Sequence, residues 1–285
     1  MSESNRSLAG LPPLRDVIVR YDLRAHKGLG QHFLLDLNIT QKIVRMAGNL
    51  HGIHVAEIGP GPGGLTRAIL ASDAASVTAI ERDARCCAAL QELIEAEPGR
   101  LRLIEGDALT CDLIALTPAP RAIIANLPYN IGTELLLRWL RQARAFTGMI
   151  LMFQREVAER ICAPPGGKNY GRLSVIAQAC CRVKKCFDLP ARAFTPPPKV
   201  NSTVLHFTPR ADAPDEKLLA ALEQITAAAF GQRRKMLKSS LADFGGADFL
   251  AAMNIAPSAR AETLAVTDFL RMAQAVMLFE KHTAH

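Results

Sequence analysis

Short apolar segments alternate with longer helical patterns between residues 55 and 161, and this alternation constrains the possible folds most strongly. The apolar segments cover residues 55–58, 76–80, 102–104, 122–125 and 148–153. The helical patterns cover residues 65–71, 83–97, 134–142 and 155–161. Strands that alternate with helices form a parallel sheet with helices on both faces. The sequence therefore predicts an α/β fold built on a mostly parallel sheet.

Two further apolar segments, at 173–183 and 200–207, are expected to add an antiparallel edge to this sheet, although 173–180 also suits the start of a helix. The run TPRADAPD at 208–215 fits neither the helical nor the strand periodicity and is the best candidate for a linker. Only helical patterns follow it. For a chain of 285 residues we predict a weakly ordered N-terminal arm at 1–23, a sheet domain at 24–208 and a small all-helical domain at 209–285.

Composition narrows the class of protein. Hydrophobic residues make up 49% of the chain, yet no apolar run reaches the roughly 18 residues of a membrane span. The start lacks the unbroken apolar stretch of a secretory signal, so we expect a cytoplasmic protein.

A net charge of +7 suits a polyanionic partner such as nucleic acid. The seven cysteines include no CxxC pair, which argues against a disulfide framework and against a zinc site, and we predict no metal.

A glycine-rich turn, EIGPGPGG at 57–64, follows the first predicted strand. Gly59 and Gly61 allow a ligand to approach the backbone closely, and Glu81 follows 22 residues after Gly59, where a carboxylate can accept hydrogen bonds from ribose hydroxyls. The same turn occurs in dinucleotide enzymes and in tight strand-to-helix connections. Glu57 disfavours a phosphate, so the turn fits S-adenosylmethionine better than a dinucleotide.

The third predicted strand is followed by Gly106, Asp107 and Ala108. Asp107 can accept a hydrogen bond from an adenine amine, and the backbone N–H of Ala108 can donate to the ring. Alternatively, Asp107 caps the next helix.

The run Asn126-Leu127-Pro128-Tyr129 ends the fourth predicted strand. Ligands of such sheets bind outside the carboxyl ends of the strands, so we expect this run beside the glycine turn. The Asn126 side-chain oxygen and the Leu127 carbonyl can accept hydrogen bonds from an adenine amine and so expose its lone pair. Pro128 fixes the backbone, and Tyr129 offers a ring for stacking. A plain strand-ending turn is the alternative; no general base is predicted.

Together these segments resemble the ribosomal RNA adenine N6,N6-dimethyltransferases of the small subunit. The matching motifs are KGLGQHFL (27–34), EIGPG (57–61), GDA (106–108), NLPYNI (126–131), YGRLSV (170–175) and FTPPPKV (194–200). The resemblance implies a Rossmann-like class I methyltransferase sheet and S-adenosylmethionine as the donor. It implies, as acceptors, two adjacent adenosines in the 3′-terminal hairpin of small-subunit (16S) rRNA within a pre-30S particle. We expect a monomer without a membrane partner.

The resemblance also assigns residues. It places the donor against His32, Leu34, Gly59, Glu81, Asp107 and Asn126. We also expect Gln31, Glu57, Gly61, Arg82 and Ala108 in the donor site. Tyr129 and Phe194 are expected to sandwich a flipped adenine. The family usually has Asn where this chain has His32. The basic residues expected to contact RNA phosphates are Arg233, Arg234, Lys235 and Lys238, although such a run can also be a solvated helix face.

Three other functions remain open at this stage. A methyltransferase acting on large-subunit rRNA would have much the same site. A non-catalytic assembly factor would keep the fold and use only its basic surface, although the intact NLPY run at 126–129 argues against lost chemistry. A nicotinamide-dependent oxidoreductase has little support, because the sequence offers no His or Lys paired with an Arg at a hydride site.

Overall fold

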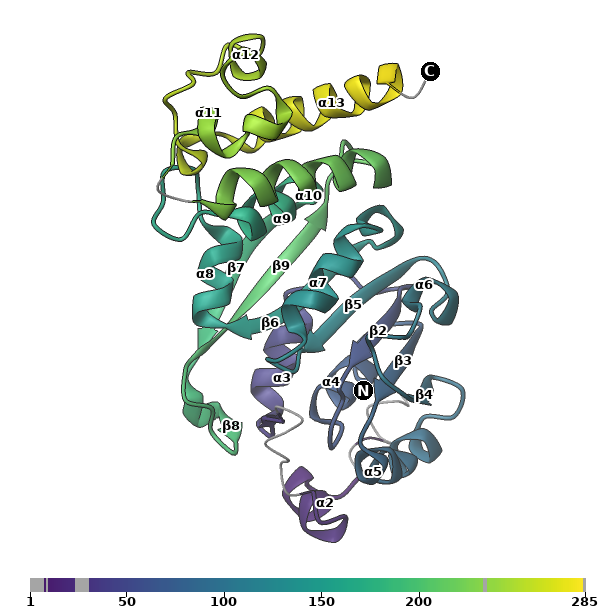
Figure 1. Ribbon diagram of the computed structural model, residues 1–285. Helices are drawn as coiled ribbons and strands as arrows, with labels where there is room; N and C mark the ends of the chain where they lie inside the picture. The colour runs from purple at the N-terminus through teal and green to yellow at the C-terminus, as the bar shows by residue number, and fades with distance from the viewer. Residues whose placement is uncertain (1–7, 9, 24–30, 233–234, 284–285) are drawn as a thin grey trace. The chain divides into compact units, whose positions relative to one another are not determined.

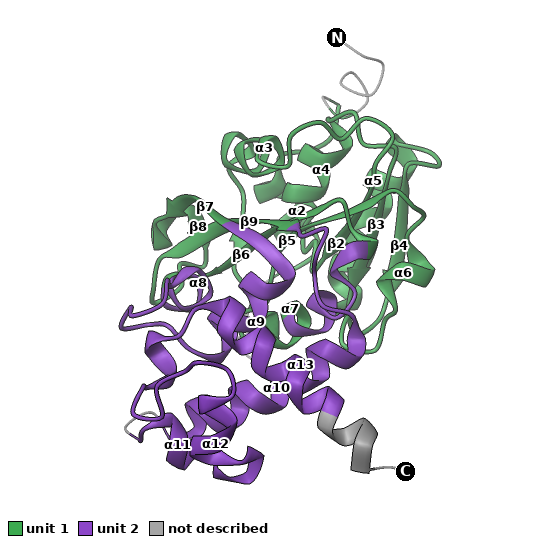
Figure 2. Cartoon of the chain, turned by 90° about the horizontal axis from the view of Figure 1, so that it is seen from above, with its two compact units in different colours: residues 1–136, 145–155, 184–208 green, residues 137–144, 156–183, 209–285 purple. Residues whose placement is uncertain are grey.

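The computed structural model describes residues 8, 10–23, 31–232 and 235–283. The chain divides into two compact units, and neither is contiguous in sequence (Figure 2). Unit 1 comprises residues 1–136, 145–155 and 184–208, and unit 2 comprises 137–144, 156–183 and 209–285. The break at 208–209 coincides with the predicted linker, but two internal segments also group with the C-terminal helices. Our assignment of a methyltransferase domain at 24–208 and an RNA-binding domain at 209–285 stays a prediction.

A seven-stranded sheet has the order β4-β3-β2-β5-β6-β9-β7 (Figure 1). Its strands are β2 (His54–Ile58), β3 (Ser76–Glu81), β4 (Leu101–Glu105), β5 (Arg121–Asn126), β6 (Gly148–Gln154), β7 (Cys181–Leu189) and β9 (Ser202–Pro209). Strands β4, β3, β2, β5 and β6 run parallel to their neighbours, and β9 runs antiparallel to β6. The predicted mostly parallel sheet with an antiparallel edge is confirmed. The strand order reverses direction between β2 and β5, the place where such sheets bind ligands.

A separate two-stranded ribbon was not expected from the sequence. It pairs β1 (Phe33–Leu34) with β8 (Phe194–Thr195) in antiparallel register. Phe33 lies opposite Thr195, and Leu34 lies opposite Phe194. The ribbon joins the segment before the first sheet strand to the segment before β9.

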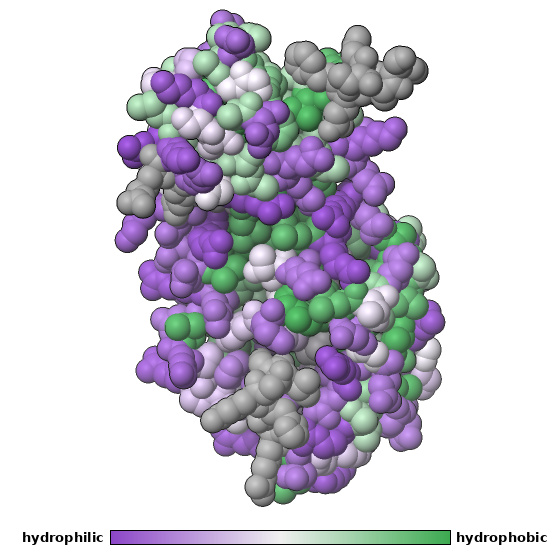
Figure 3. All heavy atoms as spheres, viewed as in Figure 1, coloured by the Kyte–Doolittle hydropathy of each residue, from purple (hydrophilic) through white to green (hydrophobic). Residues whose placement is uncertain are grey.

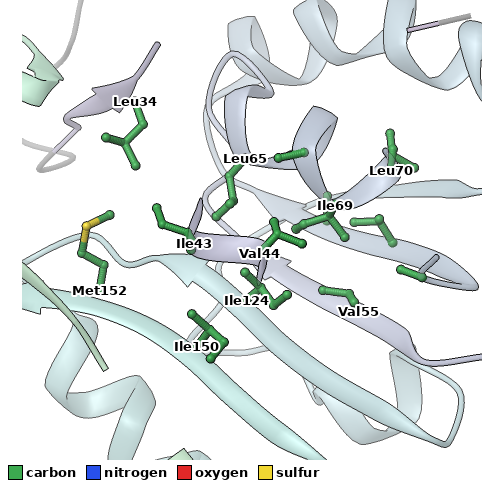
Figure 4. Close-up of a cluster of buried hydrophobic side chains, with 14 of the residues drawn as sticks. Leu34, Ile43, Val44, Val55, Leu65, Ile69, Leu70, Ile124, Ile150 and Met152 are labelled. Atoms are coloured by element: carbon green, nitrogen blue, oxygen red, sulfur yellow. The ribbon is translucent and has the colours of Figure 1, made fainter. Parts of the chain in front are cut away.

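Helices connect and cover the strands of the sheet. Those of unit 1 are α2 (Leu14–Arg20), α3 (Leu37–Arg45), α4 (Gly64–Leu70), α5 (Ala84–Ala96) and α6 (Leu113–Leu116), and α7 (Gly132–Leu140) and α8 (Arg155–Cys162) each begin in unit 1. The Asp36 side chain caps α3 by accepting from the Asn38 N–H. One face of the sheet packs against α3 and α4 through a cluster that includes Ile43, Ile69 and Ile124 (Figure 4). This core fixes the strand ends on which the site depends.

The N-terminal segment differs from our expectation of a weakly ordered arm. Residues 14–20 form α2, and Leu14, Val17 and Leu23 are buried. Val17 and Leu23 pack with Phe33 and with residues of α5 in a small apolar cluster. Burial of these side chains stabilises a helix that is too short and too charged to be recognised from its sequence.

Unit 2 is helical apart from the ends of β7 and β9 that fall within it. Its helices are α9 (Arg172–Cys180), α10 (Glu216–Gly231), α11 (Leu237–Ser240), α12 (Gly246–Ala251) and α13 (Val266–Thr283). The Phe230 ring stacks on Phe269 and meets the Tyr170 ring edge-on. The Tyr170 hydroxyl donates to the carbonyl of Leu264. These contacts join the segment before α9 to α10 and α13. Segment 173–180 lies within α9, which leads directly into β7.

Hydrophilic side chains predominate on the face seen in Figure 3, with smaller apolar areas between them. Within the described part of the chain, no helix combines the length and the apolar character that crossing a membrane requires.

Candidate active site

A cavity opens at the carboxyl ends of the central strands in unit 1. Its walls are formed by the residues that follow β2, β3, β4 and β5 together with the β1 segment. The cavity brings together all the predicted donor-site residues, namely Gln31, His32, Leu34, Glu57, Gly59, Gly61, Glu81, Arg82, Asp107, Ala108 and Asn126. It also contains Leu127, Pro128 and Tyr129 of the predicted reaction segment. Two distant sequence motifs therefore share one cavity.

The glycine turn makes the cavity floor. Gly59 and Gly61 have φ angles of 65° and 56°, in the left-handed region that favours glycine. A Cβ atom added to Gly61 would lie 2.8 Å from the Phe33 ring, and one added to Gly64 would lie 2.4 Å from the Leu34 carbonyl oxygen. The turn is thus packed directly beneath β1, which leaves no room for larger residues.

Glu81 ends β3 and holds the turn in place. Its Oε2 accepts from the Gly61 N–H at 3.0 Å, and its Oε1 accepts from the N–H groups of Arg82 and Asp83, each at 2.8 Å. Burial raises the pKa of Glu81, and the three backbone hydrogen bonds partly offset this shift. A carboxylate offers about four acceptor positions. Acceptance of both ribose hydroxyls by Glu81 stays a prediction, and it requires one backbone bond to be shared or released.

Glu57 is the residue before the last one of β2, and it is almost completely buried, with 1% of its surface exposed. Burial raises its pKa to about 8, interaction with Thr66 offsets part of the shift, and the charge of Glu81 adds to it. Glu57 Oε2 makes no hydrogen bond to any of the described residues. Because Glu57 lines the cavity, this buried oxygen is a candidate hydrogen-bond partner for a polar group of a ligand.

Asp107 follows β4 and caps a turn rather than the next helix, α6, whose N-cap is Asp112. Acceptance of an adenine amine by Asp107 stays a prediction. Its Oδ1 accepts from the Leu109 N–H at 2.9 Å, which caps the turn after the strand. Its Oδ2 lies 3.4 Å from the guanidinium of Arg82. The Arg82 side chain is 68% exposed, so this ion pair is weak and can yield to a ligand amine.

Asn126 ends β5 with its side chain oriented by β1. Its Nδ2 donates to the His32 carbonyl at 3.0 Å. A carbonyl can only accept, so this bond fixes which end of the amide is the donor. The amide oxygen, Oδ1, is the end left to accept at the cavity wall.

Tyr129 is held at both its hydroxyl and its ring. The hydroxyl lies 2.6 Å from Ser202 Oγ at the start of β9. The ring centroid lies 5.4 Å from that of His32, with the planes tilted by 33°. Burial raises the pKa of the Tyr129 hydroxyl, so it remains protonated at neutral pH. Its half-buried ring lines the cavity and is available for stacking.

Phe194 does not line the cavity in this structure. Only 3% of its surface is exposed, and it packs in the cluster that contains Leu34 and Ile43. Stacking of Phe194 on an adenine stays a prediction, and it requires this side chain to leave the core. The resemblance assigned Phe194 by position, whereas the β1–β8 pairing turns it inward.

Three residues of the site were not identified from the sequence. Phe33 packs on the turn, Asp83 accepts a hydrogen bond from Gln31 Nε2 at 3.1 Å, and Ser202 holds Tyr129. Phe33 belongs to the motif KGLGQHFL (27–34), so this motif is the sequence signal that could have identified it. Ser202 is 73 positions from Tyr129, and no local pattern could have linked the two.

The predicted phosphate contacts belong to unit 2. Lys235 and Lys238 are exposed, and Lys238 lies on the four-residue helix α11. Arg233 and Arg234 lie outside the described residues. Contact of these four residues with RNA stays a prediction.

The open parallel sheet, the glycine turn and the cavity at the strand ends define a class I methyltransferase. Solved structures agree: a dimethyladenosine transferase from Plasmodium falciparum has a TM-score of 0.76 and 26% identity, covering 88% of this chain and 98% of that one. The 23S rRNA methyltransferase ErmE has a TM-score of 0.65 and 25% identity, covering 85% of this chain and 98% of its own.

Sequence comparison identifies the family. Residues 22–277 match the model of the ribosomal RNA adenine dimethylase family, and the chain belongs to that family. The ribosomal RNA small subunit methyltransferase A of Paramagnetospirillum magneticum is 55% identical over 270 residues, 94% of this chain and 96% of the relative. The protein of the same name from Sinorhizobium medicae is 56% identical, over 94% of this chain and 98% of its own.

Proposed function

We propose that this protein dimethylates N6 of two adjacent adenosines in the 3′-terminal hairpin of small-subunit rRNA. The observation that carries the proposal is the shared cavity, where the NLPY segment at 126–129 lies beside the glycine turn at 59–64. Relatives that are 55% and 56% identical bear the name ribosomal RNA small subunit methyltransferase A, which supports the small subunit as the source of the acceptor.

The cavity residues fit S-adenosylmethionine. Three acidic side chains line the cavity, those of Glu57, Glu81 and Asp107; Glu57 is mostly a neutral carboxyl below about pH 8, and its Oε2 makes no hydrogen bond to the described residues. Such a lining favours a cationic ligand that carries hydroxyls and an amine, and it disfavours a pyrophosphate. When bound, S-adenosylmethionine supplies an electrophilic methyl group on its sulfonium sulfur.

The residues of this chain would prepare the acceptor amine. Asn126 Oδ1 and the Leu127 carbonyl accept its two N–H hydrogens, which draws the nitrogen lone pair out of conjugation with the ring. The Asn126 amide is already oriented by the His32 carbonyl, so little reorganisation accompanies binding. Tyr129 supplies the stacking face. Holding the reactants in line is the main contribution that we assign to the protein, and general figures for oriented reactants allow about 7–11 kcal/mol.

The remaining parts of the proposal concern the partner. The net charge of +7 and the exposed Lys235 and Lys238 support contact with RNA phosphates. We propose a monomer that acts on a pre-30S particle in the cytoplasm, where this acceptor is assembled.

The decisive experiment uses tritiated S-adenosylmethionine with small ribosomal subunits that lack the modification. Primer-extension stops at two adjacent adenosines near the 3′ end of the RNA are the expected result. Label confined to large-subunit RNA would instead indicate the activity named for the structural relative ErmE. Tight particle binding without label would indicate a non-catalytic assembly factor. Either of these results would overturn the proposal.

A further inference from the structure

We propose that His32 is a positioning residue that supports Tyr129 as the stacking platform for the acceptor base and ties that platform to the turn at Thr195 and Pro196. This inference rests on the proposed function, because it concerns the acceptor side of the same cavity. It gives His32 a role on the acceptor side in addition to the predicted contact with the donor.

Three contacts meet at His32. Its ring packs against the Tyr129 ring with centroids 5.4 Å apart. Its Nδ1 lies 2.8 Å from the Pro196 carbonyl oxygen. Its own carbonyl accepts from Asn126 Nδ2. One residue thereby joins the reaction segment after β5 to the turn after β8.

The geometry fixes the hydrogen on the imidazole. The Pro196 carbonyl has no hydrogen to donate, so Nδ1 of His32 must be the donor. The ring is consequently held in one orientation, and the β1–β8 pairing holds the backbone on the same side. The support behind Tyr129 is therefore anchored at both the side chain and the main chain.

Tyr129 is fixed at a second point. Ser202 is buried at the start of β9, and its Oγ lies 2.6 Å from the Tyr129 hydroxyl. A phenol held at its oxygen can still rotate and tilt unless one ring face is covered. The His32 ring packs against the Tyr129 ring and so limits this motion, and under the proposal the base stacks on the face away from His32.

Two substitutions separate the two contacts of the His32 side chain. In His32→Asn, the amide nitrogen stands close to the place of Nδ1 and can still donate to Pro196, but the ring is lost. In His32→Phe, the ring stays and the hydrogen bond is lost. The backbone carbonyl that orients Asn126 is present in both variants. If His32 only stabilised the fold, there would be no reason for His32→Phe to keep the position of Tyr129 while His32→Asn loses it.

The first readout needs no RNA. The chain contains only three tyrosines, Tyr21, Tyr129 and Tyr170. Incorporation of 3-fluorotyrosine therefore gives three fluorine NMR signals, which single Tyr→Phe variants assign. We expect the Tyr129 signal to shift or broaden in His32→Asn and to stay near its wild-type position in His32→Phe. Tyr21 and Tyr170 serve as internal controls for folding.

The second readout is kinetic. With unmodified small subunits, we expect His32→Asn to lower kcat/KM by about fivefold and His32→Phe to stay within about twofold of wild type, the scale of an aromatic pair. Donor affinity by calorimetry, measured in both variants, separates the effect on Tyr129 from any contribution of His32 to donor binding.

Four results would overturn the inference. These are an unmoved Tyr129 signal in His32→Asn, equal kinetics for His32→Asn and wild type, a His32→Phe variant as poor as His32→Asn, and a loss of donor affinity that accounts for the kinetic change. A wild-type protein that methylates no small subunit would contradict the proposed function instead, and the NMR result would still decide whether His32 positions Tyr129.

Discussion

The side-chain amide of Asn126 donates to the backbone carbonyl of His32 at 3.0 Å. This bond connects the last residue of β5 to the residue before β1, and the two residues are 94 positions apart in sequence. Because the amide nitrogen is committed to His32, the amide oxygen is the end that can meet an acceptor amine. The orientation required for the proposed chemistry is thus present before any ligand binds.

Replacement of Asn126 by alanine should abolish turnover and spare donor binding. The alanine has no oxygen to accept the adenine amine, and we expect kcat to fall by at least about 100-fold, the usual cost of one preorganised polar group in an active site. Activity on unmodified small subunits and calorimetric donor affinity measure the two effects. Asn38→Ala, at an exposed position in the first turn of α3, is the matched control. Equal losses of turnover and donor affinity would contradict the assigned role.

Glu57 should make the donor-free protein less stable as the pH rises. Its pKa is about 8 in the folded state against an ordinary value of 4.5, so the folded state binds more protons between these values. Stability is then highest below about pH 4.5 for this group and falls as the pH rises toward 8, by at most about 1.4 kcal/mol per pH unit. Chemical denaturation at a series of pH values measures the slope.

The control for this prediction is a pair of isosteric variants. Glu57→Gln removes the titrating group and should flatten the slope between about pH 5 and 8. Glu105→Gln, at the exposed end of β4, should keep the wild-type slope. Identical slopes for wild type and Glu57→Gln would mean that Glu57 is ionised throughout.

Glu81→Gln should weaken both the fold and the donor site. One carboxylate oxygen becomes an NH2 group, which must face a backbone N–H of Gly61, Arg82 or Asp83. We expect a loss of about 1–3 kcal/mol in the free energy of unfolding, and at least about tenfold weaker donor binding. Denaturation and calorimetry provide the two values. Glu95→Gln, exposed on α5, should change neither, and an unaltered donor affinity in Glu81→Gln would exclude Glu81 as a ligand.

Reversal of two exposed charges should test the phosphate contacts in unit 2. Lys235→Glu combined with Lys238→Glu should weaken binding to small subunits and reduce the slope of log affinity against log salt by roughly 1.5, for two lost phosphate contacts. Filter binding across a salt series gives the slope. Lys217→Glu combined with Arg45→Glu makes the same change in net charge at other exposed sites. If both double variants behave alike, net charge alone is responsible.

The central sheet could be predicted because buried parallel strands leave a strong sequence signal. The apolar pattern places each of the strands β2 to β6 within two residues of its observed bounds. The edge was harder: β7 contains Arg182, Lys184, Lys185 and Asp188, so only its backbone hydrogen bonds mark it as a strand. Strands β1 and β8 have two residues each, too few for any period to be visible.

The same reasoning explains which site residues could be found. Glu57, Glu81 and Asn126 all stand at or beside strand ends, so the rule that ligands bind at the carboxyl ends of strands groups them from the sequence alone. The side chain of Phe194 faces the core because the residue pairs with Leu34, and this contact joins distant segments of the sequence. The burial of Leu14 and Val17, which orders α2, depends on tertiary packing that local propensity does not reveal.

The hydrogen bond from His32 to Pro196 joins residues 164 positions apart. During synthesis, the residues of the glycine turn and of Asn126 leave the ribosome well before Pro196 does. The contact of the Pro196 carbonyl with the His32 ring cannot form until then, and closing so long a loop is slow. A nascent or truncated chain that ends before residue 196 therefore carries every residue that lines the cavity but lacks the Pro196 contact that holds the His32 ring, so the side of the cavity at His32 and Tyr129 becomes fixed only late in the synthesis of the protein.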